Sequence, residues 1–110
     1  MDTIYHIAQN TGFLGGEISS TTSISFSSTT AEISASLSNA NTFVRVVATQ
    51  NCHIAFGTFG STSASTANNT YLPANTVEVF YTGSSNSIAA IRNSADGILY
   101  IDVLTFPAVA

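Results

Sequence analysis

Lysine is absent from this sequence of 110 residues, and only eight residues carry a formal charge. A soluble domain normally covers its surface with charged side chains of both signs. Here 31 serines and threonines must supply much of the polar surface instead. With two arginines and a net charge of −4, the chain lacks the basic surface that displaces counterions from phosphates. We therefore expect no binding to nucleic acid and no docking on anionic membranes.

Cysteines and long apolar runs are scarce as well. Cys52 is the only cysteine, so no disulfide can form within the chain. No apolar run approaches the roughly 20 residues of a membrane-spanning helix. The first residues lack a basic region followed by an apolar stretch, so we expect no secretory signal. Because a small domain without disulfides has a thin stability margin, association between copies is the remaining common way to stabilise it.

Residues that could do chemistry are few and are scattered along the chain. Cys52 and His53 are adjacent on an expected strand, where neighbouring side chains point to opposite faces, so they cannot form a nucleophile–base pair. No two of the Asp, Glu, His and Cys residues have a local metal-ligand spacing. Glu78 and Asp102 could be neighbours on separate strands, but most such carboxylate pairs are incidental. We expect no enzyme activity, no metal site and no cofactor.

The sequence does contain a series of short apolar runs with a period of two, which is the pattern of β-strands. Ile24 and Phe26 alternate with serines, and so do Ile33, Ala35 and Leu37, which predicts two strands with a solvated face. The other expected strands span residues 42–49, 51–57, 76–82, 87–92 and 98–104.

Two of these segments carry a further signal. Both faces of the 42–49 strand are substantially apolar, which indicates a central strand or a strand at an interface. The Asp96-Gly97 step between the last two strands predicts a hairpin, because glycine accepts the positive φ that such turns require. The longest segment without a pattern, residues 58–70, is expected to be a surface loop.

Short strands separated by regularly spaced turns are typical of a closed or layered β fold. The sequence therefore predicts an all-β fold, an antiparallel β-sandwich or jelly-roll-like barrel of about seven or eight strands. We expect a single β-sandwich domain over residues 17–104. An N-terminal arm with a glycine-rich hinge (1–16) precedes it, and an apolar C-terminal tail (105–110) follows.

Large apolar side chains in the arm, the loop and the tail are candidates for contact with a partner. Residues 3–8 are expected to form either a first strand or a docking arm, which could pair with a strand of a neighbouring subunit. Some of the aromatic residues could instead form a platform on which sugars stack, although the chain has no tryptophan. The predicted partner contacts are Ile4, Tyr5, Ile7, Phe13, Leu14, Phe59, Phe106 and Val109.

Six stretches follow one another along the chain: Thr42–Val46, Asn51–Gly57, Tyr71–Asn75, Val77–Phe80, Ile88–Ile91 and Ala95–Ile101. In this order, between Thr42 and Leu104, they resemble small tailed-phage virion proteins of the head-decoration, or capsid cement, type. The first 41 residues carry no part of the resemblance. It implies a β-sandwich without catalytic residues that is bound to the outside of a capsid, often in clusters around local symmetry axes.

We therefore expect a phage capsid decoration protein on the outer surface of the head, which stabilises the shell by bridging neighbouring capsid subunits. Its expected partners are the major capsid protein and copies of itself, with a trimer suggested by family analogy. It would be made in the host cytoplasm and located on the exterior of the virion. Two alternatives stay open, namely a minor structural component of the tail, neck or head fibre, and a jelly-roll module that binds a host glycan.

Overall fold

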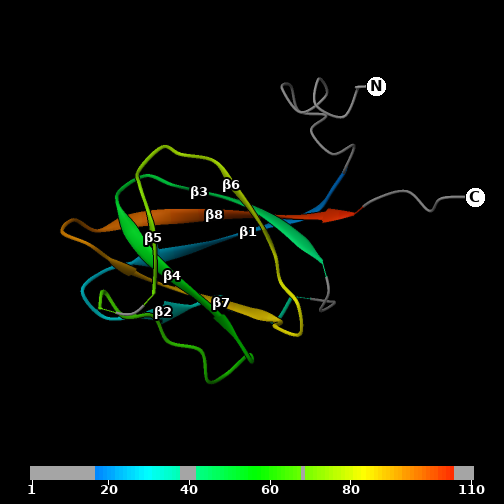
Figure 1. Ribbon diagram of the computed structural model, residues 1–110, viewed down its shortest axis with the longest axis horizontal. Helices are drawn as coiled ribbons and strands as arrows, with labels where there is room; N and C mark the ends of the chain where they lie inside the picture. Colours follow the sequence, from blue (N-terminus) through cyan, green and yellow to red (C-terminus); the bar gives the residue numbers. More distant parts are fainter. Residues whose placement is uncertain (1–16, 38–41, 68, 106–110) are drawn as a thin grey trace, which may run out of the picture.

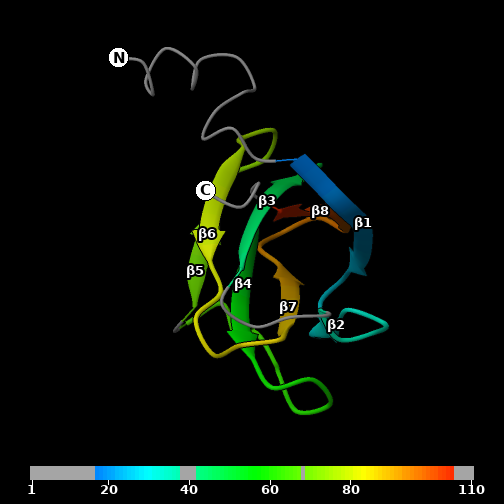
Figure 2. The same cartoon turned by 90° about the vertical axis from the view of Figure 1, so that its right-hand side faces the viewer.

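The computed structural model describes residues 17–37, 42–67 and 69–105, which form a β-sandwich with no helix among them (Figures 1 and 2). Two four-stranded antiparallel sheets pack against each other, with strand orders β1-β8-β3-β6 (sheet A) and β2-β7-β4-β5 (sheet B). The strands are β1 (Glu17–Phe26), β2 (Ala31–Glu32), β3 (Phe43–Ala48), β4 (Cys52–Gly57), β5 (Thr70–Leu72), β6 (Glu78–Tyr81), β7 (Ser87–Arg92) and β8 (Gly97–Thr105).

The strands pair in a nested order, β1 with β8, β2 with β7, β3 with β6 and β4 with β5, and every pair is antiparallel. The pairs β3–β8 and β4–β7 then join these four ribbons into two sheets. Nested pairing across two sheets is the connectivity of a jelly roll. The predicted antiparallel sandwich of jelly-roll type is confirmed, with eight strands in the part of the chain that the structure describes.

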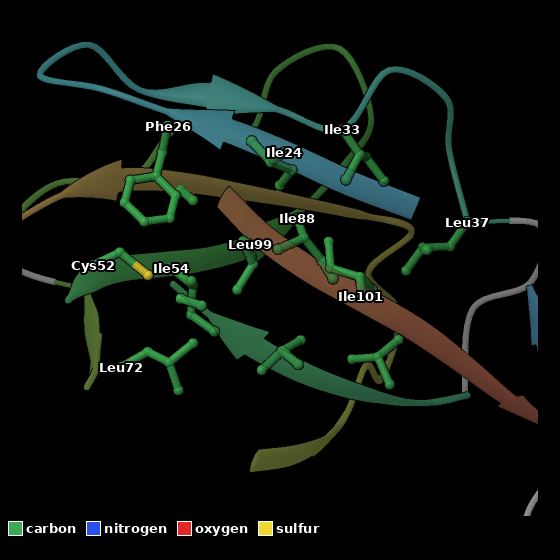
Figure 3. Packing of buried hydrophobic residues seen from close by; sticks show 14 of the residues in the cluster. Ile24, Phe26, Ile33, Leu37, Cys52, Ile54, Leu72, Ile88, Leu99 and Ile101 are labelled. Carbon is green, nitrogen blue, oxygen red and sulfur yellow. The ribbon is translucent and has the colours of Figure 1, made fainter. Parts of the chain in front are cut away.

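The core lies between the sheets because alternate residues of each strand are apolar and point inward. On β3, Val44, Val46 and Ala48 are buried and the residues between them are half-buried, as the sequence predicts. Ile24 and Phe26 of β1 are buried too, which confirms the alternation among the serines. Figure 3 shows Ile24 and Phe26 in the core together with side chains of sheet B such as Ile54 and Ile88. Burying an aliphatic or aromatic side chain of this size contributes about 1.5–3 kcal/mol to stability.

The strand predicted from Ile33, Ala35 and Leu37 is wrong. β2 ends at Glu32, and the chain bends at Ala35, which is exposed. Ile33 and Leu37 still reach the core, and their N–H groups donate to carbonyl oxygens of the segment that forms β7 and its entry (3.0 and 2.8 Å). The bend lies between these two contacts, so the alternation of apolar residues in this segment does not come from an extended strand.

The hairpin predicted at Asp96-Gly97 does not form either. β7 and β8 lie in different sheets, so this turn carries the chain from sheet B to sheet A (Figure 1). Arg92 and Asp96 form an ion pair across it (2.7 Å). The φ of Gly97 is not positive. Glycine is needed there for close approach, because a Cβ would lie 2.8 Å from Oγ1 of Thr49 and 2.9 Å from Cζ of Phe26.

The two ends of the sandwich domain lie side by side. Glu17, the first residue of β1, is the register partner of Thr105, the last residue of β8. The chain therefore enters and leaves sheet A at the same end (Figure 1). The predicted arm (1–16), the turn at 38–41 and residues 106–110 of the predicted tail lie outside the described residues.

Candidate interaction surface

The outer face of sheet A carries its side chains in rows that cross the strands, and three of these rows include β3. A fourth, Ile98–Ser25, lies on β8 and β1 alone. Residues paired directly across antiparallel strands share a face, so the register assigns each outward residue to a row. Written towards β1, the three rows that include β3 are Val47–Tyr100–Ser23, then Val79–Arg45–Asp102–Thr21, then Tyr81–Phe43–Leu104–Ile18.

Apart from Val79, the middle row is polar, and its two charges neutralise each other. Arg45 donates hydrogen bonds from Nε and Nη2 to Oδ2 of Asp102 (3.2 and 2.7 Å). The hydroxyl of Thr21 donates to the other oxygen, Oδ1 of Asp102 (2.9 Å). The carboxylate on β8 is thus held by side chains from both neighbouring strands. Because the pair is partly exposed, it contributes about 1 kcal/mol or less to the stability of the free protein.

The rows on either side are mainly apolar and aromatic, although Leu104 in the third row is itself buried, at 7% exposed. Tyr100 is 43% exposed and Tyr81 is 56% exposed, although Tyr81 also packs on Phe43 with ring centroids 5.1 Å apart. Val77, two residues before Val79, is 57% exposed. Single exposed apolar residues are ordinary on a soluble protein, but a contiguous apolar patch marks a surface that binds something.

Among the described residues, the loop between β4 and β5 covers part of the outer face of sheet B. Ala64 of this loop packs against Ala55 and Ala89, which point outward from β4 and β7. The N–H of Ala64 donates to Oγ1 of Thr30 (2.7 Å). The predicted surface loop is confirmed, and it forms a layer on the sandwich.

Glu32 fastens this loop to the sheet. Its Oε2 accepts hydrogen bonds from the N–H of Gly60 in the loop (2.8 Å) and from the hydroxyl of Ser87 on β7. Ser87 is fully buried, so its hydroxyl needs such a partner. The hydrogen bond from Ser87 is the main cause of a lowered pKa for the Glu32 carboxyl, and the bond from Gly60 acts in the same direction.

Cys52 and His53 point to opposite faces of β4, as the strand alternation predicts. Cys52 is buried between the sheets, and burial raises the pKa of its thiol to about 11. The ring nitrogens of His53 lie on the other side, 3.2 Å from the main-chain oxygen of Asn69 and 3.2 Å from Oδ1 of Asn93. The two residues are therefore not a nucleophile and its base.

The carboxylates of Glu78 and Asp102 do not face each other. Glu78 is the register partner of the inward-pointing Val46 on β3, whereas Asp102 points outward from β8 on the far side of β3. In the three described ranges, no group of three or more Cys, His, Asp or Glu residues could hold a metal ion. No helix long and apolar enough to span a membrane occurs in those ranges.

Of the eight predicted partner contacts, the described residues include Phe59. It is 40% exposed in the loop after β4, and its N–H donates to Oδ1 of Asn86 (2.9 Å). The other seven lie outside the described residues: Ile4, Tyr5, Ile7, Phe13, Leu14, Phe106 and Val109.

The sequence interpretation missed the rows on sheet A, including Val47 and Tyr100. A signal for them was present, because both faces of the 42–49 strand are apolar. The structure confirms that this strand is central, between β8 and β6. Grouping the outward residues of β3 with those of β1, β6 and β8 required the strand registers, which the sequence does not show.

No family model matches the chain, and no curated protein matches it. Among solved structures, it is similar to a chain from a structure described as "Bacillus endospore appendages form a novel family of disulfide-linked pili". That alignment has a TM-score of 0.48 and 11% sequence identity, and it covers 81% of this chain and 85% of that chain. A likeness at this level carries no conclusion about what the present chain binds or builds.

Proposed function

We propose that this chain is a phage capsid decoration protein that sits on the outer surface of the head. It stabilises the shell by bridging neighbouring capsid subunits, and it has no catalytic role. The proposal rests on the resemblance of residues 42–104 to head-decoration proteins and on the neutral, hydroxyl-rich surface. The jelly-roll fold is compatible with it but hosts many functions, so the fold adds little weight.

The position of the chain ends is the observation that carries the proposal furthest. Because Glu17 pairs with Thr105, the arm (1–16) and the tail (105–110) both start from one end of sheet A. Both segments are rich in the apolar residues expected at a partner contact. Sixteen extended residues reach up to about 55 Å, which is far enough to contact a subunit other than the one beneath the domain. One end of the sandwich would then anchor it across a seam between subunits.

The charge of the chain suits dense packing on a shell. The net charge of −4 is modest, so the repulsion between adjacent copies is limited. Residual repulsion is screened beyond about 8 Å at physiological salt. Many copies can therefore sit side by side at a low electrostatic cost.

The test is binding to phage heads that lack this protein. Full-length protein and a variant without residues 1–16 are mixed with such heads and sedimented with them. We expect the full chain to bind and to raise the temperature at which the heads rupture, and we expect the deletion to weaken both effects strongly. Phe59→Ser tests the loop contact in the same assay. Unchanged binding by the deletion variant would show that the arm is not the anchor.

The copy number in the virion separates the capsid from the tail, neck or head fibre. Copies on the order of the number of capsid subunits support decoration, because each lattice position offers an equivalent site. A single ring of copies would instead place the protein in the tail or neck.

A glycan-binding module is the second candidate, and Tyr71 favours it. The Tyr71 ring is 47% exposed and packs on the ring of His53, with centroids 5.3 Å apart. The backbone of Asn69 and the amide of Asn93 lie on the two sides of His53. An exposed aromatic ring near amides is a common platform for sugars. Saturable glycan binding that Tyr71→Ser abolishes would support this function, and a blank glycan array would count against it.

A further inference from the structure

We propose that the outer face of sheet A binds the same face of a second copy of this chain about a two-fold axis. The face has a polar row between two largely apolar rows, all held on one sheet. This contact between copies does not depend on whether the protein binds a capsid, and it concerns residues of the sandwich rather than those of the arm and tail.

The arrangement of the rows makes the face complementary to itself. Two sheets that pack face to face keep their strands roughly aligned, within about 30°. When a two-fold axis runs along the strands between β3 and β8, β3 of one copy lies over β8 of the other. Val47 of each copy then faces Tyr100 of the other, and apolar rows meet apolar rows. An isologous contact of this kind closes on itself as a dimer.

The charges on the face obey the same symmetry. Arg45 is on β3 and Asp102 is on β8, in one row and on either side of the proposed axis. The axis therefore places Arg45 of each copy over Asp102 of the other copy. The two ion pairs within the chains become one cluster in which each charge has neighbours of opposite sign. No charge of this row is buried without a partner, which is the arrangement that would otherwise oppose association.

The size of the face sets the strength of the contact. Four strands about 4.8 Å apart and three rows about 7 Å apart define a patch of roughly 20 by 20 Å, or on the order of 400 Å² for each copy. A standard protein–protein interface buries about 800 Å² on each partner. The dimer should therefore be reversible in solution, and a shared surface that holds copies close together would favour it by raising their effective concentration.

The first measurement is sedimentation velocity of the full chain over a dilution series. We expect the mass to shift between one and two chains, and we expect Tyr100→Ser to weaken the dimer by about tenfold or more, as for an aromatic residue at the centre of an interface. Tyr71→Ser is the matched control, because Tyr71 is a similarly exposed tyrosine on sheet B. It should leave the dissociation constant unchanged.

The second measurement uses charge exchange. Arg45→Asp and Asp102→Arg each place like charges opposite one another in the dimer, so each variant alone should associate more weakly than the natural chain. Mixed together, they restore opposite charges across the contact, and the mixture should form a heterodimer. The doubly exchanged chain keeps its internal ion pair, so it should remain folded and associate with itself but not with the natural chain.

Three outcomes of these experiments would overturn the proposal. A chain that stays monomeric at every concentration has no such interface, and a trimer would mean that the contact has another symmetry. Equal weakening by Tyr71→Ser and Tyr100→Ser would place the contact elsewhere or reduce it to non-specific association. Binding of a monomeric chain to phage heads would leave the proposed function standing while this inference fails.

Discussion

Glu32 on β2 and Ser87 on the adjacent strand β7 share a hydrogen bond that joins two layers of the protein. The same carboxylate oxygen accepts the N–H of Gly60 from the loop over sheet B (2.8 Å). A single acidic side chain therefore satisfies a buried hydroxyl and fastens a loop of more than ten residues. The sequence contains six acidic residues, and nothing in its pattern distinguishes this one.

Replacing this carboxylate should loosen the loop and change the acid sensitivity of the fold. The pKa of Glu32 is lowered in the folded chain, so the ionised form adds stability above its ordinary pKa of 4.5, and that stability is lost as the pH falls through the folded pKa. We expect Glu32→Gln to lower the melting temperature at neutral pH and to show a smaller further loss below about pH 4. The exposed Glu78→Gln is the control, and thermal melts over pH give the comparison. Parallel pH curves for Glu32→Gln and the natural chain would contradict the assignment.

Adding a methyl group at Gly97 should destabilise the sandwich. The new Cβ would lie within 3 Å of both Thr49 and Phe26, and Phe26 is a packed core residue that has little room to move. We expect Gly97→Ala to cost about 1–3 kcal/mol in urea unfolding. At Gly57 a Cβ would meet side-chain atoms of Thr62 in the loop, so Gly57→Ala should cost less. The reverse order would mean that close approach is not what requires glycine at position 97.

The thiol of Cys52 should be inert in the folded protein. It is buried, and its pKa is raised to about 11, so almost none of it is thiolate at neutral pH. We expect thiol reagents to label Cys52 only as fast as the chain unfolds. Cys52→Ala should cost about 1 kcal/mol, and Cys52→Ser should cost more because it buries a hydroxyl. Labelling that is rapid and independent of denaturant would show that the site opens locally.

The bend after β2 can be tested with two substitutions two residues apart. Ile33 is buried in the core, so Ile33→Ala should cost about 2–5 kcal/mol in chemical denaturation. Ala35 is exposed, so Ala35→Ser should change stability by less than about 0.5 kcal/mol. Similar large costs at both positions would restore the strand that the alternation predicts.

Alternation predicted most of the strands because it reports one property, the division of a strand between core and surface. It succeeded on β3, where buried and half-buried residues alternate. It also succeeded on β4 and β7, although the first four residues of each are buried whichever face they point to. It failed at Ala35, because alanine is small enough to be exposed or buried at little cost. It also missed β5, whose three residues are too few to show a period and end before Pro73.

The connections between strands were harder to predict than the strands. The Asp96-Gly97 step has the composition of a hairpin turn, yet it links two sheets, because β8 finds its partners in β1 and β3. Pairing between strands far apart in the sequence cannot be predicted from the residues of the turn between them. For the same reason the outward rows of sheet A could not be predicted from the sequence of any one strand. The two apolar faces of residues 42–49 indicated only that this strand was central or lay at an interface.

The nested pairing of the strands also implies an order of assembly. Joining Glu17 to Thr105 in an unfolded chain closes a loop of about 90 residues, whereas β4 and β5 are separated by a short loop. Each inner pair shortens the loop that the next pair must close, so we expect folding to proceed from the middle of the chain outward and to be slow for a domain of this size. Pulsed hydrogen exchange that protects β1 before β4 would contradict this order. The seam between the first and last strands closes last, and the end of the sandwich from which both terminal segments emerge is completed only when the rest of the fold is already in place.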